Sequence, residues 1–187
     1  MGVTEMITSK EALKEYIEAD NAGQQRQNLK WKLISRYAGY PQQRISKFKY
    51  YLRMQEYYIN TARGNKFKGL LGLYYERRKN RLGEQLGIEI GPNCFGKGLQ
   101  IYHSGIVVNA AVRAGENCRL HGGNCIGNNG KTEAVPRLGN NVDIGYGAVL
   151  IGDIQIADGC VIGANAVVNK TVEKKDSTVV GIPAKVI

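Results

Sequence analysis

The stretch LGNNVD, IGYGAV, LIGDIQ, IADGCV, IGANAV, VNKTVE, which runs from residue 138 to residue 173, repeats every six residues. Each hexad opens with an aliphatic residue, and its fifth residue is small or aliphatic. An α-helix would need apolar residues at a period of about 3.6 and a plain strand at a period of two, so six fits neither. A short strand followed by a tight corner fits it. Gly, Asn or Asp at the fourth position then supplies the left-handed backbone of the corner.

Three such sides make a coil, and a stack of coils is a parallel β-helix, for which hexapeptide repeats are the sequence signature. Consecutive matches at two positions of every hexad argue against chance periodicity in a glycine-rich strand protein. Regular coiling is expected to end near Thr171, which breaks the fourth-position rule. Carried backwards, the first positions fall on Ile126, Leu120, Ala114 and Val108 and then, less regularly, on Tyr102, Gly96 and Ile90.

The change of composition after Leu86 predicts two regions in the 187-residue chain. We expect a basic α-helical region over residues 1–86 and a β-helix over residues 87–187, starting near Ile88. Within the β-helix, the segment NNGKTEAVPR over residues 128–137 lacks the apolar pattern, which indicates a surface loop where binding residues can collect. The chain has no apolar run of about 18 residues and no signal-peptide pattern at its start, so we expect a cytoplasmic protein.

The four cysteines fit a reduced protein without a metal site. Cys94, Cys118 and Cys160 fall in phase with the fifth position of a hexad, where a small apolar side chain is wanted, and Cys125 falls one residue later. They form no CxxC pair. We therefore predict packing residues, with neither disulfides nor zinc ligands.

Nearly all of the net charge of +10 comes from the N-terminal region, where tyrosines are interspersed among lysines and arginines from Arg26 to Arg81. Such helices can contact anionic lipid, a phosphate-bearing acceptor or nucleic acid. The other interpretation is a solvated surface whose tyrosines pack on neighbouring helices. Among the ligands we favour an anionic surface at the inner face of the membrane, and we expect no nucleic-acid partner.

The two histidines of the chain, His103 and His121, each follow a first position of the hexad and stand beside glycine, in YHSG and LHGG. They are one regular coil apart, so they would lie one above the other at about 4.8 Å. Solvated corner histidines are the alternative. The shared phase and the glycine neighbours favour a general base that faces an open groove.

The span from Ile88 to Ile187 resembles the hexapeptide-repeat acyltransferases, within them the serine acetyltransferase-like branch. The resemblance rests on HSGIVVNAAVRAGENC, on IGNNGKTEAVPRLGNNVDIGYGAVLIGDI and on the closing VVGIPAKVI. It implies a left-handed β-helix, an exception to the usual right-handed crossover. It also implies acetyl transfer from acetyl-CoA to a hydroxyl, and a homotrimer with active sites between subunits. The outward residues expected to need cover by a partner subunit are Ile151, Val167 and Val168.

The resemblance also implies roles for single residues. His103 matches the catalytic base, although HSG is one residue shorter than the HxxG of serine acetyltransferases, which makes His121 the second candidate. Lys185 matches a basic position that meets a phosphate of the cofactor. Tyr102 and Asn124 are expected to contact the acceptor, and no metal is expected. The residues that match the pantetheine-binding positions are Gly145, Tyr146, Gly163 and Ala164.

Two departures from serine acetyltransferases bear on the acceptor. Those enzymes carry Asp before the base and His before the proline of the loop, where this chain has Tyr102 and Val135. A site that leaves the charges of an amino acid unpaired loses selectivity for it, whereas a tyrosine ring can cover a pyranose. We therefore predict a sugar hydroxyl in surface polysaccharide biosynthesis. The alternatives are serine, a metal hydratase of the same fold, which would need three histidines, and a non-catalytic β-helix.

Overall fold

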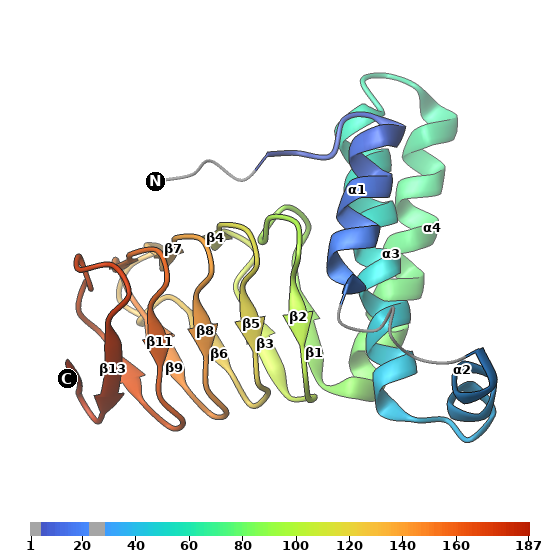
Figure 1. Ribbon diagram of the computed structural model, residues 1–187. Helices are drawn as coiled ribbons and strands as arrows, with labels where there is room; N and C mark the ends of the chain where they lie inside the picture. Colours follow the sequence, from blue (N-terminus) through green and yellow to red (C-terminus); the bar gives the residue numbers. More distant parts are fainter. Residues whose placement is uncertain (1–4, 23–28) are drawn as a thin grey trace.

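The computed structural model describes residues 5–22 and 29–187. Four helices stand together at one end of a stack of short strands, and the stack leads away from them to the C-terminus (Figure 1). The helices are α1 (Lys10–Asp20), α2 (Leu29–Tyr37), α3 (Pro41–Thr61) and α4 (Lys66–Leu86). The αL residue Gly87, with φ 62°, ends α4 and leads directly into the first strand at Ile88.

The strands form three sheets that share one core, as a β-helix requires. One sheet has the order β1-β3-β6-β9-β12, a second β10-β7-β4, and the third β14-β13-β11-β8-β5-β2. All neighbours pair in parallel except the closing β13 and β14, which are antiparallel. The strands are β1 (Ile88–Ile90), β2 (Gln100–Ile101), β3 (Ile106–Val108), β4 (Arg113–Ala114), β5 (Arg119–Leu120), β6 (Cys125–Gly127), β7 (Arg137–Leu138), β8 (Asp143–Ile144), β9 (Val149–Ile151), β10 (Gln155–Ile156), β11 (Val161–Ile162), β12 (Val167–Val168), β13 (Thr178–Gly181) and β14 (Ala184–Val186).

The hexad explains both the core and the corners. The first-position residues from Leu138 to Val168 are buried, with exposed fractions of 4% or less. At the fourth position, Asn141 and Asn165 have φ of 57° and 56°, and Gly147 and Gly159 have φ of 72°. This is the left-handed region that favours glycine and asparagine, so the pattern sets where the chain turns. The expectation that Val168 needs cover by a partner subunit is wrong, because it points into the core, whereas Ile151 and Val167 are half-buried on the outside.

The phase expected for the first coil is wrong by one residue at Tyr102 and Gly96, whereas Ile90 is buried and pairs with Val108 as expected. Ile101, rather than Tyr102, pairs with Leu120 and lies in the core, and Phe95, rather than Gly96, pairs with Ala114. The cause is the corner after β2. Five residues lie between Ile101 and Val107, but four lie between their partners Leu120 and Cys125. The first corner therefore holds one additional residue.

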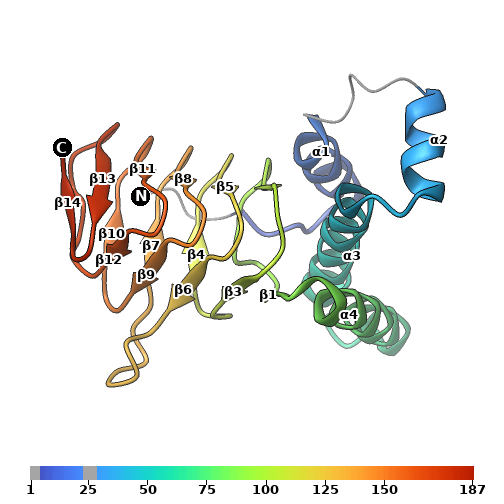
Figure 2. The ribbon, with the colours of Figure 1, turned by 90° about the horizontal axis from the view of Figure 1, so that it is seen from below.

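The segment from residue 128 to residue 136 leaves the stack between β6 and β7 as a projecting loop (Figure 2). Its side chains organise its own backbone: Asn129 Oδ1 accepts hydrogen bonds from the amides of Lys131 and Thr132. The loop leaves from the corner between the sheets of β6 and β7. His103 and His121 stand at another corner, between the sheets of β2 and β3. The loop and the histidines of one chain therefore lie on different edges.

The helices pack as a hairpin of α3 and α4, with α1 along α3 (Figures 1 and 2). Several tyrosines lie between α3 and α4, where the rings of Tyr58 and Tyr75 stack with centroids 5.6 Å apart. Others, such as Tyr37 on α2, are exposed. Ser9 and Asn65 cap the amino ends of α1 and α4. In the described ranges, no helix combines the length and apolar character needed to cross a bilayer.

Buried charges join this helical region to the first coil. The Arg53 side chain on α3 is fully buried and donates hydrogen bonds to Asp20, to Glu56 and to the carbonyls of Phe95 and Gly96. A buried charge is tolerated only when it is paired and hydrogen-bonded, as it is here. The helices and the β-helix therefore share one bonded junction.

The packing role predicted for the cysteines is confirmed for three of them and is wrong for Cys125. Cys94, Cys118 and Cys160 are buried and Cys125 is exposed, and all four thiols are free. Burial raises the pKa of Cys94 to about 11 and that of Cys118 to about 12. A thiol with so high a pKa is a poor nucleophile at neutral pH.

Candidate functional site

Nearly all the site residues expected from the sequence lie in two adjacent rows along one edge of the β-helix. The first row, which we call the face row, follows the ends of the strands in the sheet of β2, β5, β8, β11 and β13. Strand register places equivalent positions of successive coils next to one another, and backbone hydrogen bonds such as His121 N–H to Ile144 O continue the register beyond the strands. The members of this face row are Tyr102, His121, Gly145, Gly163, Val180 and Lys185.

The second row, which we call the corner row, occupies the neighbouring corner. Its members are His103, Gly122, Tyr146 and Ala164. The rings of His103 and Tyr146 are 6.4 Å apart, with Gly122 between them. A Cβ at Gly122 would lie 2.7 Å from Cβ of His103 and 3.2 Å from Cε2 of Tyr146. Gly122 also has φ of 112°. This glycine is therefore required, because it makes the gap across which His103 and Tyr146 face each other.

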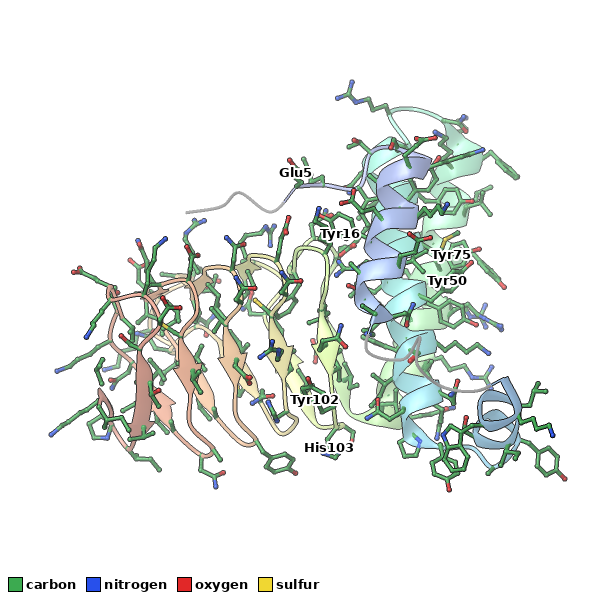
Figure 3. The ribbon with its side chains drawn as sticks, viewed as in Figure 1. Glu5, Tyr16, Tyr50, Tyr75, Tyr102 and His103 are labelled. Carbon is green, nitrogen blue, oxygen red and sulfur yellow. The ribbon has the colours of Figure 1, made fainter. Side chains whose placement is uncertain are left out.

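The two histidines are not stacked, contrary to the expectation from the sequence. The additional residue in the corner after β2 shifts the register, so that Tyr102 lies against His121 with ring centroids 4.8 Å apart. His103 falls instead in the corner row. Figure 3 shows Tyr102 and His103 at the same edge of the β-helix, in the coil next to the helices. Gln42 at the start of α3 donates a hydrogen bond to the carbonyl of Tyr102 and ties the helices to this edge.

His121 has a carboxylate partner that the sequence did not reveal. Its Nε2 lies 2.7 Å from Oδ1 of Asp143, and Nη1 of Arg119 lies 3.1 Å from Oδ2 of the same carboxylate. Because an ionised carboxylate only accepts hydrogen bonds, Nε2 of His121 carries a hydrogen and Nδ1 of the neutral ring is left as an acceptor. Arg119 pairs with Asp143 because the loop of residues 128–136 lies outside the coil. This strand register is the signal from which the contact between His121 and Asp143 could have been predicted.

The base expected from the resemblance, His103, is exposed at the corner. In the parts of the chain that the structure describes, no carboxylate is bonded to its ring. The half-exposed face row and the exposed His103 therefore leave an imidazole accessible to a substrate on this edge.

Asn124 lies in the protein interior, where we had expected an acceptor contact. It is 1% exposed, its amide donates to the carbonyl of Gly145 at 2.7 Å, and its Oδ1 accepts from the amide of Gly122. Asn124 therefore holds the corner that carries the site. Val135 likewise packs against the hydrophobic core.

The stacking of the coils requires small residues in the face row. A Cβ at Gly145 would lie 2.6 Å from the amide nitrogen of Ala164, and one at Gly163 would lie 2.8 Å from Cγ1 of Val180. Glycine is thus needed for the coils to stack, and it leaves a smooth strip between His121 and the exposed Lys185. Over residues 5–22 and 29–187, no group of three His, Cys, Asp or Glu side chains is arranged to hold a metal ion.

Comparisons with known proteins match the hexapeptide repeat and the fold of this chain. Residues 136–170 match the family described as bacterial transferase hexapeptide (six repeats). A serine acetyltransferase of Synechococcus elongatus is 41% identical over 105 residues, which cover 54% of this chain and 43% of that protein. The chain spans about half the length of the curated relatives it matches.

Solved structures show the same fold over almost the whole chain. Soybean serine acetyltransferase superimposes with a TM-score of 0.71 at 22% identity, over 95% of this chain and 70% of that one. The serine acetyltransferase of Neisseria gonorrhoeae gives a TM-score of 0.67 at 28% identity, over 94% and 64%. These likenesses confirm a left-handed β-helix with an N-terminal helical region. The relatives and structures named here are all called serine acetyltransferases.

Proposed function

We propose that the protein is an acetyl-CoA-dependent O-acetyltransferase. The observation that carries the proposal is the pair of adjacent rows, which join an accessible imidazole at one end to an exposed lysine at the other along a glycine strip. The similarity to serine acetyltransferases over the β-helix supports the same chemistry.

In the proposed reaction, His103 removes the proton of the acceptor hydroxyl while the oxygen attacks the thioester carbonyl of acetyl-CoA. The bond from carbonyl carbon to sulfur then breaks, the acetyl group stays on the acceptor oxygen, and the CoA sulfur leaves and takes up a proton. A positioned base contributes about 10² to 10⁴ in rate. His103 is free to act because its ring is exposed and faces the gap at Gly122.

The C-terminal end of the two rows is the proposed binding site for CoA. Gly163 and Ala164 present backbone without a bulky side chain, Tyr146 stands exposed beside them, and Lys185 on β14 pairs with Val180 of the same row. An ammonium group here can meet a phosphate of the cofactor as a point charge. This assignment places the thioester between the lysine and the histidines.

For the acceptor we propose serine first, because the similar proteins are serine acetyltransferases. A sugar hydroxyl is the second candidate, favoured by the half-exposed ring of Tyr102 beside His121. An aromatic face of this kind can cover the apolar side of a pyranose. The two candidates differ in charge, so the acceptor assay below separates them.

We further propose a homotrimer. Residues 128–136 and the histidines stand on different edges of one protomer, so a loop can reach a histidine edge only on a neighbouring subunit, as a three-fold arrangement would allow. Contact of the basic helices with an anionic membrane surface stays a prediction from the sequence.

The test is a thiol-release assay with acetyl-CoA and a panel of acceptors: L-serine, hexoses, N-acetylated hexosamines and oligosaccharides. CoA release that depends on an acceptor supports the proposal, and the preferred acceptor decides between serine and sugar. If no acceptor of the panel raises CoA release, the proposed function is wrong.

A further inference from the structure

We infer that Arg119, His121 and Asp143, with Tyr102, form the subsite that holds the acceptor alcohol through the polar groups next to its reacting hydroxyl. The inference rests on the proposed acetyl transfer and adds Arg119 and Asp143, to which the resemblance assigns no role. The polar groups would be the ammonium and carboxylate of serine or the neighbouring hydroxyls of a sugar.

The four side chains come from three successive coils, and each of them contacts the next. Asp143 on β8 binds Arg119 at 3.1 Å through one oxygen and His121 at 2.7 Å through the other. Tyr102 lies across the other side of His121, with its ring 4.8 Å away and tilted by 44°. The carboxylate therefore fixes the imidazole between a charged pair and an aromatic face.

The cluster is built, yet it remains open to a ligand. The side chains of Arg119 and His121 are 51% and 42% exposed, whereas that of Asp143 is 23% exposed. Each keeps hydrogen-bonding capacity after these contacts: Nδ1 of His121, further N–H groups of Arg119 and lone pairs of Asp143. A solvated surface pair would contribute little, but here three polar groups and a ring converge on one point.

The position of the cluster separates it from the cofactor end. The cluster lies at the N-terminal end of the face row, where its member Tyr102 directly precedes His103 in the chain. Lys185 lies at the C-terminal end of the same row, beyond Gly145 and Gly163. A molecule held at His121 would thus lie one coil from His103, on the side toward the proposed CoA end. Asp143 acts as a positioning residue, because it reaches the acceptor through the orientation of His121 as well as by its own oxygens.

The experiment measures separate KM values for the acceptor and for acetyl-CoA, using the acceptor that the wild type acetylates from the panel of serine and sugars. The variants are Asp143→Asn and His121→Gln, which keep the size of the side chain. The control is Asp158→Asn, which removes the ion pair with Lys175 at 2.8 Å on another part of the surface. Thermal unfolding checks that every variant is folded.

We expect both subsite variants to raise the KM for the acceptor about tenfold or more, the usual cost of losing a hydrogen bond to a charged group. The KM for acetyl-CoA should stay within about twofold, and Asp158→Asn should behave as the wild type. With serine as acceptor, Arg119→Gln should raise its KM as well, because the guanidinium pairs with the carboxylate; with a sugar its effect should be smaller.

The inference is overturned if Asp143→Asn and His121→Gln leave the acceptor KM unchanged, or if they raise both KM values equally. A wild-type enzyme that binds acetyl-CoA but acetylates no acceptor would overturn the proposed function and the subsite together. Acetylation with unchanged KM values in the variants would leave the function standing and remove only the subsite.

Discussion

Nε of Arg53 on α3 lies 2.9 Å from Oδ2 of Asp20 at the end of α1, and both side chains are at most 2% exposed. Asp20 also accepts from the amide of Leu99 in the first coil, and Arg53 bonds to Glu56 at 2.9 Å. A single buried pair thus connects two helices and the β-helix. The pair has no access to water, so its loss cannot be compensated by solvent.

We predict that Asp20→Asn lowers the free energy of unfolding by about 3 kcal/mol, because it leaves the Arg53 charge partly uncompensated in the interior. Urea unfolding monitored by circular dichroism measures the change. The control is Glu18→Gln, whose partner Lys14 lies at 3.9 Å on the exposed side of α1 and which should cost less than about 0.5 kcal/mol. Equal effects of the two substitutions would contradict the role of the junction.

We predict that Lys49, next to this junction, makes the free energy of unfolding depend on pH. Burial lowers its pKa from the usual 10.5 to about 8, although Asp20 nearby opposes the shift. From about pH 8 to pH 10, the unfolded chain keeps the proton that the folded protein releases. The unfolded state then binds more protons, so the contribution of Lys49 to stability increases as the pH rises.

The measurement compares the wild type with Lys49→Met at pH 8 and pH 10. The free energy of unfolding of the wild type should rise relative to that of the variant across this range. Cys94 and Cys118, whose raised pKa values act in the opposite direction, are present in both proteins and cancel in the comparison. Parallel pH profiles would show that Lys49 is not the source.

Most of the β-helix follows from the hexad, but the part of its first coil from Phe95 to Tyr102 does not. Apolar residues at the first position and Gly or Asn at the fourth are local requirements, so Ile144 and Asn165 fall where the pattern predicts. The additional residue in the corner after Ile101 leaves no mark in that pattern, since the glycine-rich corner accommodates either length. Tyr102 and His121 became neighbours for this reason, and the expected stack of histidines was lost.

Two further features depend on contacts between distant segments. Asp143 reaches His121 through the strand register across the projecting loop, which the sequence does not specify by spacing. Arg53 belongs to a region whose basic residues we expected on the surface, yet its burial depends on carbonyls of the first coil. Neither the strand register across the loop nor the buried junction can be recognised from a local pattern in the sequence.

The gap at Gly122 gives a prediction for both activity and stability. Gly122→Ala places a methyl group 2.7 Å from Cβ of His103 at a positive φ of 112°. We expect a loss of stability of about 1–2 kcal/mol from the backbone conformation. We also expect a clear fall in turnover, because His103 must move.

The matched control for Gly122 is Gly64→Ala, between α3 and α4. Gly64 also has a positive φ, 83°, but nothing lies within 4 Å of its added Cβ. It should lose similar stability through backbone strain and keep full turnover. Unchanged turnover in Gly122→Ala would show that His103 does not need this gap.

The proposed trimer predicts a mass three times that of the 20.6 kDa chain. The half-buried outward residues Ile151 and Val167 would then be covered, which removes apolar surface from water. Light scattering at micromolar concentration measures the mass. A monomer across that range would contradict the trimer and, with it, a site shared between subunits.

The most direct test of the account is the turnover number of His103→Ala in the CoA-release assay, with the wild type and His121→Ala measured beside it. If His103 is the base, its replacement lowers turnover by about 10² to 10⁴, while thermal unfolding and acetyl-CoA binding stay unchanged. His121→Ala should act mainly on the KM for the acceptor. An active His103→Ala enzyme together with an inactive His121→Ala enzyme would contradict the assignment and make His121, oriented by Asp143, the base.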